Sequence, residues 1–480
     1  MTSQLPRLYR KGIPPNLGIV HLGLGAFFRS HGALVIENAM SDAGGDWGIL
    51  GVSLKSPLTR NKLALQGNLY TAVQMDPESQ IPRIVEVLND VLFAPEDPTE
   101  LVSRLSDPMV RIVSLTITEK GYCHVPSTGE LNIQHKDIQN DIHNTEPISA
   151  IGYLVRALAI RRANGCRPFT VLSCDNLPNN GKVARNVVVG LAELIDPSLA
   201  YWINKEGRFP STMVDRIVPA TTQQDIQRLA ALTGKIDEAP VFHEPFLQWV
   251  IEDDFVDGQR PYFENTLGVK MVKDVTLFEH MKVRMLNGAH SSLAYLGCLA
   301  GYQTIAETVK DPLFTKFILK LWNQEIIPTL TAPEGIKLHA YGNDLLDRFS
   351  NPAIRHRTWQ IAMDGSQKLP QRIVATIVDN LDVGRPCHGL TLALAAWMRY
   401  VGGTDDRGER IEVKDPLASK LLELSNSGLE PRAKVANLLS IEEIFPIKIA
   451  ERLHENVTAA YSNLVEKGAR GSLETVTELL

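Results

Sequence analysis

Strand-like and helix-like hydrophobic patterns alternate along the first half of the chain. Runs of β-branched and apolar residues, which are typical of buried parallel strands, cover residues 17–23, 47–54, 111–118 and 169–176. Between them apolar positions recur with a helical spacing, as in residues 98–108 and 149–165, the latter ending at the capping residue Gly165. The alternation predicts an α/β fold with an open, doubly wound sheet of Rossmann type.

The strand patterns stop after about Lys273, and helical patterns separated by Pro and Gly take over. A chain of 480 residues exceeds what one hydrophobic core usually holds. We therefore expect a Rossmann-type domain over residues 1–273 and a mostly α-helical domain over residues 274–480. Ligand pockets form preferentially at domain junctions, so chemistry is expected near this boundary.

Composition and charge favour small-molecule chemistry. The chain has 44% hydrophobic residues and a formal net charge of −6, and no run of like charges indicates a nucleic-acid or membrane partner. Five scattered cysteines without a C-x-x-C pair indicate a reduced compartment. No apolar window has the length of a signal core or a membrane span. We expect a cytoplasmic protein.

A glycine turn follows the first predicted strand and predicts a dinucleotide site. Glycines at this place let the backbone approach a pyrophosphate at a helix N-terminus, and an arginine could add a phosphate contact. The third glycine of G-x-G-x-x-G is missing, so a turn that binds no ligand is the alternative. The candidate cofactor-binding residues are Leu22, Gly23, Leu24, Gly25, Ala26, Phe27, Phe28 and Arg29.

The second predicted strand leaves the cofactor's 2′ position open. It ends without the acidic residue that would hold the ribose of NAD, and offers Lys55 and Arg60, which could meet the 2′-phosphate of NADP. The alternative, which is the favoured interpretation, is that both are solvated surface cations. We expect NAD, with NADP as the alternative.

Polar residues interrupt a helical stretch that is otherwise apolar, residues 278–302. On an α-helix Glu279, Lys282, Asn287 and His290 would share an arc of about 140°. They could form a structural network, since buried charges need partners. They could also exchange a proton with a substrate hydroxyl, with a lysine as base and amide and imidazole donors on the oxyanion. No H-E-x-x-H or similar spacing is present, so no metal is expected.

Several blocks resemble the polyol-specific long-chain dehydrogenases, the mannitol dehydrogenase family. They are "KVRMLNGAHSSLAYLGCLAGY", "IVHLGLGAFFRSH", "IVSLTITEKGYC", "VLSCDNLPNNG", "MVDRIVP" and "EPFLQWVIEDDF". The resemblance covers nearly the whole chain. It implies an N-terminal Rossmann-type domain, a helical C-terminal domain with the site between them, a metal-independent mechanism and a monomer or weak oligomer.

The resemblance also implies roles for single residues. Lys282 resembles the general acid/base, and Asn176 and Asn287 resemble the pair that holds the oxyanion. His290 resembles the histidine that orients the substrate near the lysine.

Two further residues match, and one departs from the family pattern. Asp215 resembles a substrate hydroxyl contact, and Glu279 resembles a residue near the proton exit. Phe28 stands where the family usually has a histidine, which removes a hydrogen-bond donor beside the cofactor site.

The segment "RHRTWQIAMDGSQK" bears on the substrate. Mannitol-type members keep an arginine where this chain has Gln360, whereas Arg355, Arg357 and Lys368 resemble the pattern of the fructuronate reductases in the family. A guanidinium is the natural partner of the carboxylate that fructuronate carries. On a helix the two arginines would point about 200° apart, so one is expected to reach the substrate, with Arg357 favoured. Surface cations are the alternative.

The resemblance, together with these residues, implies an NAD-dependent enzyme that interconverts D-fructuronate and D-mannonate. The alternatives are a polyol 2-dehydrogenase acting on mannitol or arabinitol, another aldonate such as altronate, and a cofactor-binding sensor without catalysis.

Overall fold

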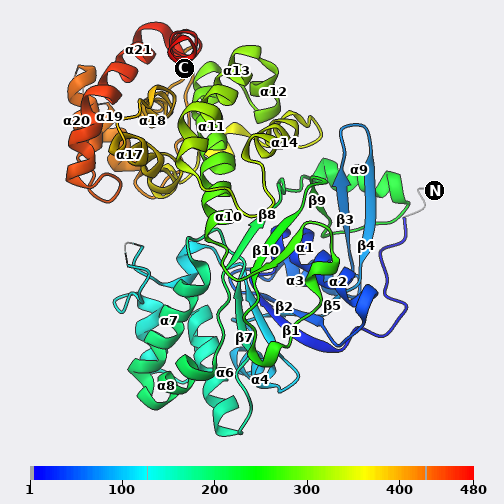
Figure 1. Cartoon of the computed structure of the whole chain (residues 1–480). Helices are drawn as coiled ribbons and strands as arrows, with labels where there is room; N and C mark the ends of the chain where they lie inside the picture. The colour runs from blue at the N-terminus through cyan, green and yellow to red at the C-terminus, as the bar shows by residue number, and fades with distance from the viewer. Residues whose placement is uncertain (1–4, 127, 427–429) are drawn as a thin grey trace. The chain divides into compact units, whose positions relative to one another are not determined.

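The computed structural model describes residues 5–126, 128–426 and 430–480, and the chain divides into two compact units (Figure 1). The first unit, Met1–Thr276, is an α/β domain, and the second, Leu277–Leu480, is mostly helical. The predicted fold class, a Rossmann-type sheet domain followed by a helical domain, is confirmed.

A parallel five-stranded sheet forms the centre of the first unit, with the order β5-β2-β1-β6-β7. Its strands are β1 (Leu17–Leu22), β2 (Gly48–Ser53), β5 (Leu88–Phe93), β6 (Ile112–Leu115) and β7 (Thr170–Ser173). Renumbered along this sheet, the order is 3-2-1-4-5, which is the arrangement of Rossmann domains. Four of the strands were predicted from sequence, and β5 was not.

Helices cover both faces of this sheet because neighbouring strand residues point to opposite sides. Val20 packs into a core with α4, α6, α7 and α8, while Ile19 packs into a second core with α2 and α3. The helices of this unit are α1 (Ala26–Ser30), α2 (Gly32–Ala43), α3 (Leu58–Ala64), α4 (Pro98–Ser106), α5 (Lys136–His143), α6 (Ala150–Ala163), α7 (Asn180–Ile195), α8 (Pro197–Glu206) and α9 (Gln223–Thr233). Gly165 has a φ of +69° just after α6, as predicted for its capping role.

Two three-stranded sheets complete the first unit. One has the order β4-β3-β9 and the other β11-β10-β8. Their strands are β3 (Tyr70–Met75), β4 (Gln80–Val85), β8 (Thr212–Asp215), β9 (Val241–His243), β10 (Gln248–Glu252) and β11 (Val269–Val272). The hydrophobic pattern did not predict them; β4 is largely exposed, and β8 and β9 have only four and three residues.

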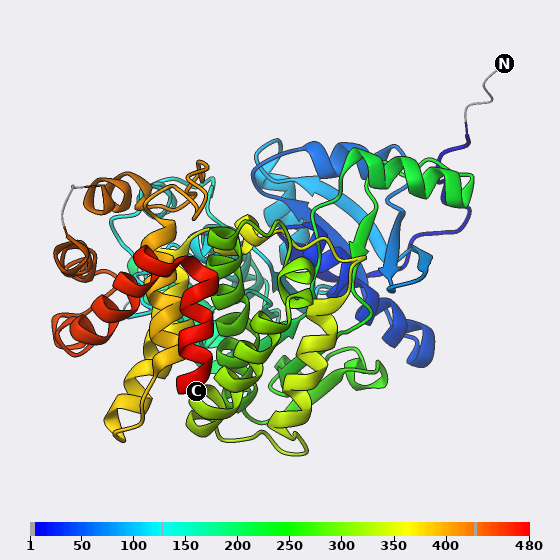
Figure 2. The same ribbon diagram turned by 90° about the horizontal axis from the view of Figure 1, so that it is seen from above.

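Helices α11 and α18 form the buried centre of the second unit, and the C-terminal helix α21, red in Figure 2, lies beside α18. The helices are α10 (Thr276–Met281), α11 (Ala289–Ala300), α12 (Ile305–Lys310), α13 (Pro312–Leu321), α14 (Leu338–Ser350), α15 (Thr358–Ala362), α16 (Gly365–Leu369), α17 (Ala375–Asp382), α18 (His388–Tyr400), α19 (Ala418–Ser425), α20 (Pro431–Leu439) and α21 (Ile447–Leu479). Three π-helical segments join some of them, at Lys282–Gly288, Trp322–Ile326 and Pro370–Val374. Among the described residues, no helix is both long and apolar enough to cross a membrane.

A buried glutamate closes the N-terminus of α18. The Glu325 side chain is 1% exposed and accepts hydrogen bonds of 2.8 Å from the backbone N–H groups of Gly389 and Leu390. Burial raises the pKa of Glu325 to about 7 despite these bonds. The protonated form is therefore favoured in the folded state at mildly acidic pH.

This raised pKa predicts a pH-dependent stability. A carboxyl whose pKa is raised on folding contributes stability at low pH, and that contribution is lost as the pH rises through the folded pKa of about 7. The difference in melting temperature, Glu325→Gln minus wild type, should therefore increase as the pH rises from about 5 to about 8. Glu334→Gln, at an exposed position, serves as the control and should follow the wild type. A constant difference between Glu325→Gln and wild type across this range would contradict the assignment.

Candidate active site

The glycine turn after β1 has the conformation that a dinucleotide site requires. Gly23 has a φ of +96°, and a Cβ there would lie 2.1 Å from the carbonyl oxygen of Thr116. At Gly25, which precedes α1, the nearest atom to an added Cβ is the Gly23 oxygen, 3.7 Å away. Gly23 therefore shapes the turn, while Gly25 leaves open space where a pyrophosphate could approach the backbone. The residues present fit a dinucleotide.

The side chains of Phe28 and Arg29 point into the protein interior. The Phe28 ring is 1% exposed and stacks on the His21 imidazole at a centroid distance of 3.3 Å. The Arg29 guanidinium is buried and donates to the carbonyl oxygens of Gly25 and Ala239. Both side chains thus hold the turn in place, and the phosphate contact expected of Arg29 stays a prediction that these bonds do not support.

The two cations expected near the cofactor's 2′ position differ in their surroundings. Lys55 is exposed, just after β2. Arg60 forms an ion pair with Glu96. A guanidinium already paired with a carboxylate is a poorer partner for a 2′-phosphate, which favours NAD over NADP.

The ends of two strands, β7 and β8, carry the other candidates of the first unit. Asn176 is exposed and lies three residues after the end of β7, on the edge of the sheet where the Gly23 turn ends β1. Asp215 is 4% exposed and ends β8. Ligands of open α/β sheets bind at the carboxyl edge of the parallel strands, so Asn176 lies where a substrate contact is expected. Asp215 lies instead in the separate three-stranded sheet, where β8 pairs antiparallel with β10, and its substrate contact stays a prediction.

The interrupted helix consists of three parts. It begins as α10, becomes π-helical at Lys282 and continues as α11 after Gly288. Residues in a π-helix turn by less than the roughly 100° of an α-helix. The angles predicted for the four polar residues from a uniform α-helical period are therefore wrong. Lys282 and His290 are both 5% exposed, and Glu279 and Asn287 are partly buried.

Tertiary contacts hold the π-helical segment. The indole N–H of Trp322 donates to the carbonyl oxygen of Met285 over 2.9 Å, which satisfies a backbone group inside the segment. A Cβ at Gly288 would lie 2.8 Å from the carbonyl oxygen of Arg372, so glycine lets this segment approach the π-helical residues Pro370–Val374. π-Helical turns are rare in proteins overall, and those that occur are often found at functional sites.

His290 lies among aromatic rings and cations. Its ring centroid is 4.2 Å from that of Phe349 and 5.2 Å from that of His356. Burial first, and then His356, Arg348, Arg372 and Lys282, lower the pKa of His290 well below its usual value. Its Nε2 atom is buried without a hydrogen-bond partner among the described residues. The imidazole is neutral and can donate or accept one bond to a ligand.

The arginines expected to contact a carboxylate are not on a helix. Arg355 and Arg357 are exposed and lie in a non-helical segment before α15. In this segment the backbone of Arg357 forms an isolated antiparallel β-bridge with that of Thr304. The prediction that they point about 200° apart is therefore wrong, because it assumed helical geometry. His356, between them, is the residue whose ring meets His290.

Lys368 lies close enough to this histidine to influence it. Burial, and then the charge of Lys368, lower the pKa of His356 to about 4. Lys368 also donates from Nζ to the carbonyl oxygen of Met363 over 2.6 Å. His356, Arg348 and Arg372 were not predicted from sequence, because only the folded chain brings them to His290.

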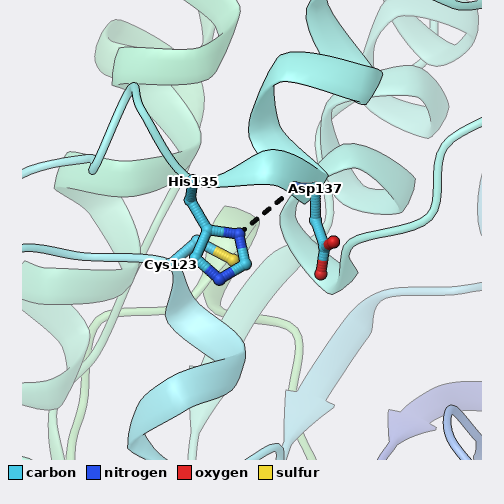
Figure 3. Close-up of side chains that lie close together, drawn as sticks. All are labelled: Cys123, His135 and Asp137. Carbon is cyan, nitrogen blue, oxygen red and sulfur yellow. Dashed lines mark hydrogen bonds between the residues drawn. The ribbon is translucent and has the colours of Figure 1, made fainter.

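A separate group of possible metal ligands lies in the first unit (Figure 3). The ligand atoms of Cys123, His135 and Asp137 lie within 4.8 Å of one another. Nδ1 of His135 accepts the backbone N–H of Asp137 over 3.3 Å at the start of α5. Burial and the nearby carboxylates of Asp137 and Asp141 raise the pKa of Cys123 to about 12. A protonated thiol and a capping imidazole favour a structural role, and metal-independent chemistry stays a prediction.

Comparisons with known proteins agree over both units. The model of the mannitol dehydrogenase Rossmann domain matches residues 17–265, and that of the mannitol dehydrogenase C-terminal domain matches residues 274–465. A D-mannonate oxidoreductase of Escherichia coli is 46% identical over 463 residues, which is 94% of each chain. A mannitol 2-dehydrogenase of Pyricularia oryzae is 39% identical over 466 residues, covering 95% of this chain and 92% of the relative.

A solved structure extends the likeness to three dimensions. The ternary complex of Pseudomonas fluorescens mannitol 2-dehydrogenase with NAD and D-mannitol superposes with a TM-score of 0.90 at 36% identity, covering 99% of this chain and 97% of that one. The chain therefore belongs to the mannitol dehydrogenase family and is an oxidoreductase acting on CH–OH groups of polyols or sugar acids.

Proposed function

We propose that the protein interconverts D-fructuronate and D-mannonate with NAD as the cofactor. The observation that carries this proposal is the group of cations around two neutral histidines, of which His290 is buried and His356 partly buried. Lys282, Arg348 and Arg372 act on His290, and Lys368 acts on His356. Such a field favours an anionic substrate over a neutral polyol. The similarity to a D-mannonate oxidoreductase supports the same substrate.

Lys282 is proposed to move the proton. As an ammonium it donates to the substrate carbonyl oxygen during reduction, and as an amine it accepts the hydroxyl proton during oxidation. The dinucleotide, when bound at the Gly23 turn, supplies or receives the hydride. Asn176 and Asn287 are proposed to hold the developing oxyanion through their amide N–H groups, and Asp215 to contact a substrate hydroxyl.

The buried nitrogen of His290 supports a role in substrate binding. A buried polar atom without a partner costs about 1–3 kcal/mol, and a substrate hydroxyl would remove that penalty. Glu279, partly buried on the turn before Lys282, is proposed to pass the proton to solvent. The five cysteines are free thiols, which is consistent with the proposed location in the reducing cytoplasm. The proposed substrate is a small molecule.

The substrate can be tested by initial rates. The protein should oxidise D-mannonate with NAD at a kcat/KM about ten- to a hundredfold above that for D-mannitol, because one charge-assisted carboxylate contact is worth about 1.5–3 kcal/mol. The reverse reaction should be followed as NADH oxidation with a panel of keto-sugars and keto-uronates, including the altronate pair.

Two variants show whether charge recognises the substrate. Lys368→Met keeps the length of the side chain without its charge and should raise KM for D-mannonate far more than for D-mannitol. Arg357→Ala tests the favoured arginine in the same way. Arg355→Ala, at the other exposed arginine, is measured in parallel for comparison. Preference for D-mannitol in the wild type would overturn the carboxylate proposal.

The second candidate function is a mannitol-type polyol 2-dehydrogenase. It is favoured by the TM-score of 0.90 to the Pseudomonas fluorescens enzyme with D-mannitol bound. The comparison of initial rates on D-mannonate and D-mannitol separates the two candidate functions. No NADH oxidation with any compound of the panel would indicate a cofactor-binding protein without catalysis.

A further inference from the structure

A polar network beneath Asn176 joins the ends of three strands. The carboxylate of Asp175 accepts hydrogen bonds from the backbone N–H groups of Ile117 and Thr118, at 2.9 and 3.0 Å, and from the Tyr122 hydroxyl at 2.9 Å. Ile117, Thr118 and Tyr122 follow β6, whereas Asp175 follows β7. One carboxylate thus ties two neighbouring strand ends together.

Asn180 extends the network to β8. Its Nδ2 donates to the carbonyl oxygens of Asp175 and Thr212, both at 2.9 Å, and its Oδ1 accepts the Thr212 N–H at 2.9 Å. The side chain is 1% exposed. Thr212 begins the strand that ends at Asp215. Both candidate substrate contacts of this unit are therefore supported by the same bonds.

The backbone around Asn176 is held on both sides. The carbonyl oxygen of Asp175 accepts the Leu177 N–H at 2.9 Å as well as the Asn180 amide, so residues 175–177 form a tight turn with Asn176 at its corner. The carboxylate also holds Thr118, whose φ of +64° is unusual for a residue with a side chain. Nearby, the Thr116 hydroxyl donates to the Gly23 oxygen at 2.8 Å, which connects this segment to the glycine turn.

We propose that Asp175 is a positioning residue that sets the place of the Asn176 amide relative to the glycine turn, through its bonds to Ile117, Thr118 and Tyr122. The assignment rests on the proposed function of Asn176 as an oxyanion donor. Its physical basis is that three donors converge on one carboxylate, an arrangement that favours the ionised form because that form only accepts hydrogen bonds.

Ionisation makes the network sensitive to pH. Burial raises the pKa of Asp175 to about 6, and the hydrogen bonds from Ile117, Tyr122 and Thr118 oppose this rise. The titratable groups that face it are Glu119, the Tyr122 hydroxyl and the Cys174 thiol, the last two being kept protonated by burial. Below about pH 6 the protonated carboxyl would turn an O–H toward one of its donors, and Asn176 would lose its support.

Asp175→Asn tests the proposal, because an amide keeps the shape but turns an NH₂ group toward these donors. We expect kcat to fall about ten- to a hundredfold, the loss typical of a misplaced reacting group, with the Kd for NADH changed less than about threefold. The fall in wild-type kcat below about pH 6 should disappear in the variant.

Asp141→Asn is the matched control. Asp141 is a buried carboxylate of the same unit that accepts the backbone N–H groups of Ile148 and Ser149 and the Ser149 hydroxyl, at the start of α6. It should lower the melting temperature as Asp175→Asn does and leave kcat unchanged. Equal losses of kcat in both variants, or unchanged kcat in Asp175→Asn, would overturn the proposal.

Tyr122→Phe keeps the proposal testable if Asp175→Asn does not fold. Removing this donor raises the pKa of Asp175, so the acid limb of kcat should move to higher pH, and an unmoved limb would overturn the proposal. Amide hydrogen exchange separates this outcome from failure of the proposed function. Amide exchange at Ile117 and Thr118 should accelerate in Asp175→Asn but not in Asp141→Asn, even if no substrate of the panel reacts. Unchanged exchange in Asp175→Asn would overturn the proposal that the Asp175 carboxylate holds these two backbone groups.

Discussion

Replacing Lys282 with alanine is expected to lower kcat by about 10²- to 10⁴-fold, which is the usual contribution of a positioned general acid or base. Lys282 is 5% exposed and opens the π-helical segment that also carries Asn287, and the neutral imidazole of His290 follows three residues after Asn287, in α11. The loss should appear in kcat with either direction of the reaction. The Kd for NADH, measured by fluorescence titration, should stay within about threefold of wild type, because Lys282 is not part of the glycine turn after β1 that is proposed to bind the cofactor.

Two further variants separate chemistry from packing. Lys282→Met keeps most of the side-chain volume and should lose activity as fully as the alanine variant. Lys320→Ala removes another partly buried lysine of the same unit, which donates to the carbonyl oxygen of Thr477 at 2.7 Å, and should leave kcat close to wild type. Wild-type-like turnover in Lys282→Ala would contradict the mechanism.

Replacing Gly23 with alanine should destabilise the first unit by about 3 kcal/mol or more. The added Cβ would lie 2.1 Å from the Thr116 carbonyl oxygen, which belongs to the backbone, and the φ of +96° is one that alanine rarely adopts. Binding of NADH should be lost together with the fold of the turn. Urea unfolding and NADH titration measure the two effects.

Gly25→Ala is the matched comparison in the same turn. The added Cβ would meet only the Gly23 oxygen at 3.7 Å, and the φ of −95° suits alanine, so stability should be nearly unchanged. NADH affinity should still fall about tenfold or more, because the Cβ fills the space through which a pyrophosphate reaches the backbone. Unchanged affinity in Gly25→Ala would show that the dinucleotide binds elsewhere.

The central sheet was predictable from local patterns. Buried parallel strands are continuous apolar runs, and β1, β2, β6 and β7 all have this form. The glycine turn was visible for a similar reason, since a positive φ and a close backbone approach both demand glycine. β4 escaped because four of its six residues are exposed, so its side chains carry no hydrophobic period.

The candidate site was predictable in its residue types and less so in its geometry. The lysine, asparagine and histidine of "KVRMLNGAHSS" were recognised from their chemistry and from the resemblance to a family. The π-helical segment that carries the lysine and the asparagine depends on the Trp322 indole and on the close approach of Arg372 at Gly288, and both partners are distant in sequence. The same limitation misplaced Arg355 and Arg357 on a helix and overlooked His356.

Local sequence by itself determined the parallel sheet, the glycine turn and the candidate residues for proton transfer, because backbone conformation and functional-group chemistry are properties of short segments. Only the tertiary structure decided how those groups are presented. The pKa values of His290, Glu325 and Asp175 arise from burial and from partners on other elements. Desolvation and charge act through space, so they emerge only when the chain has folded.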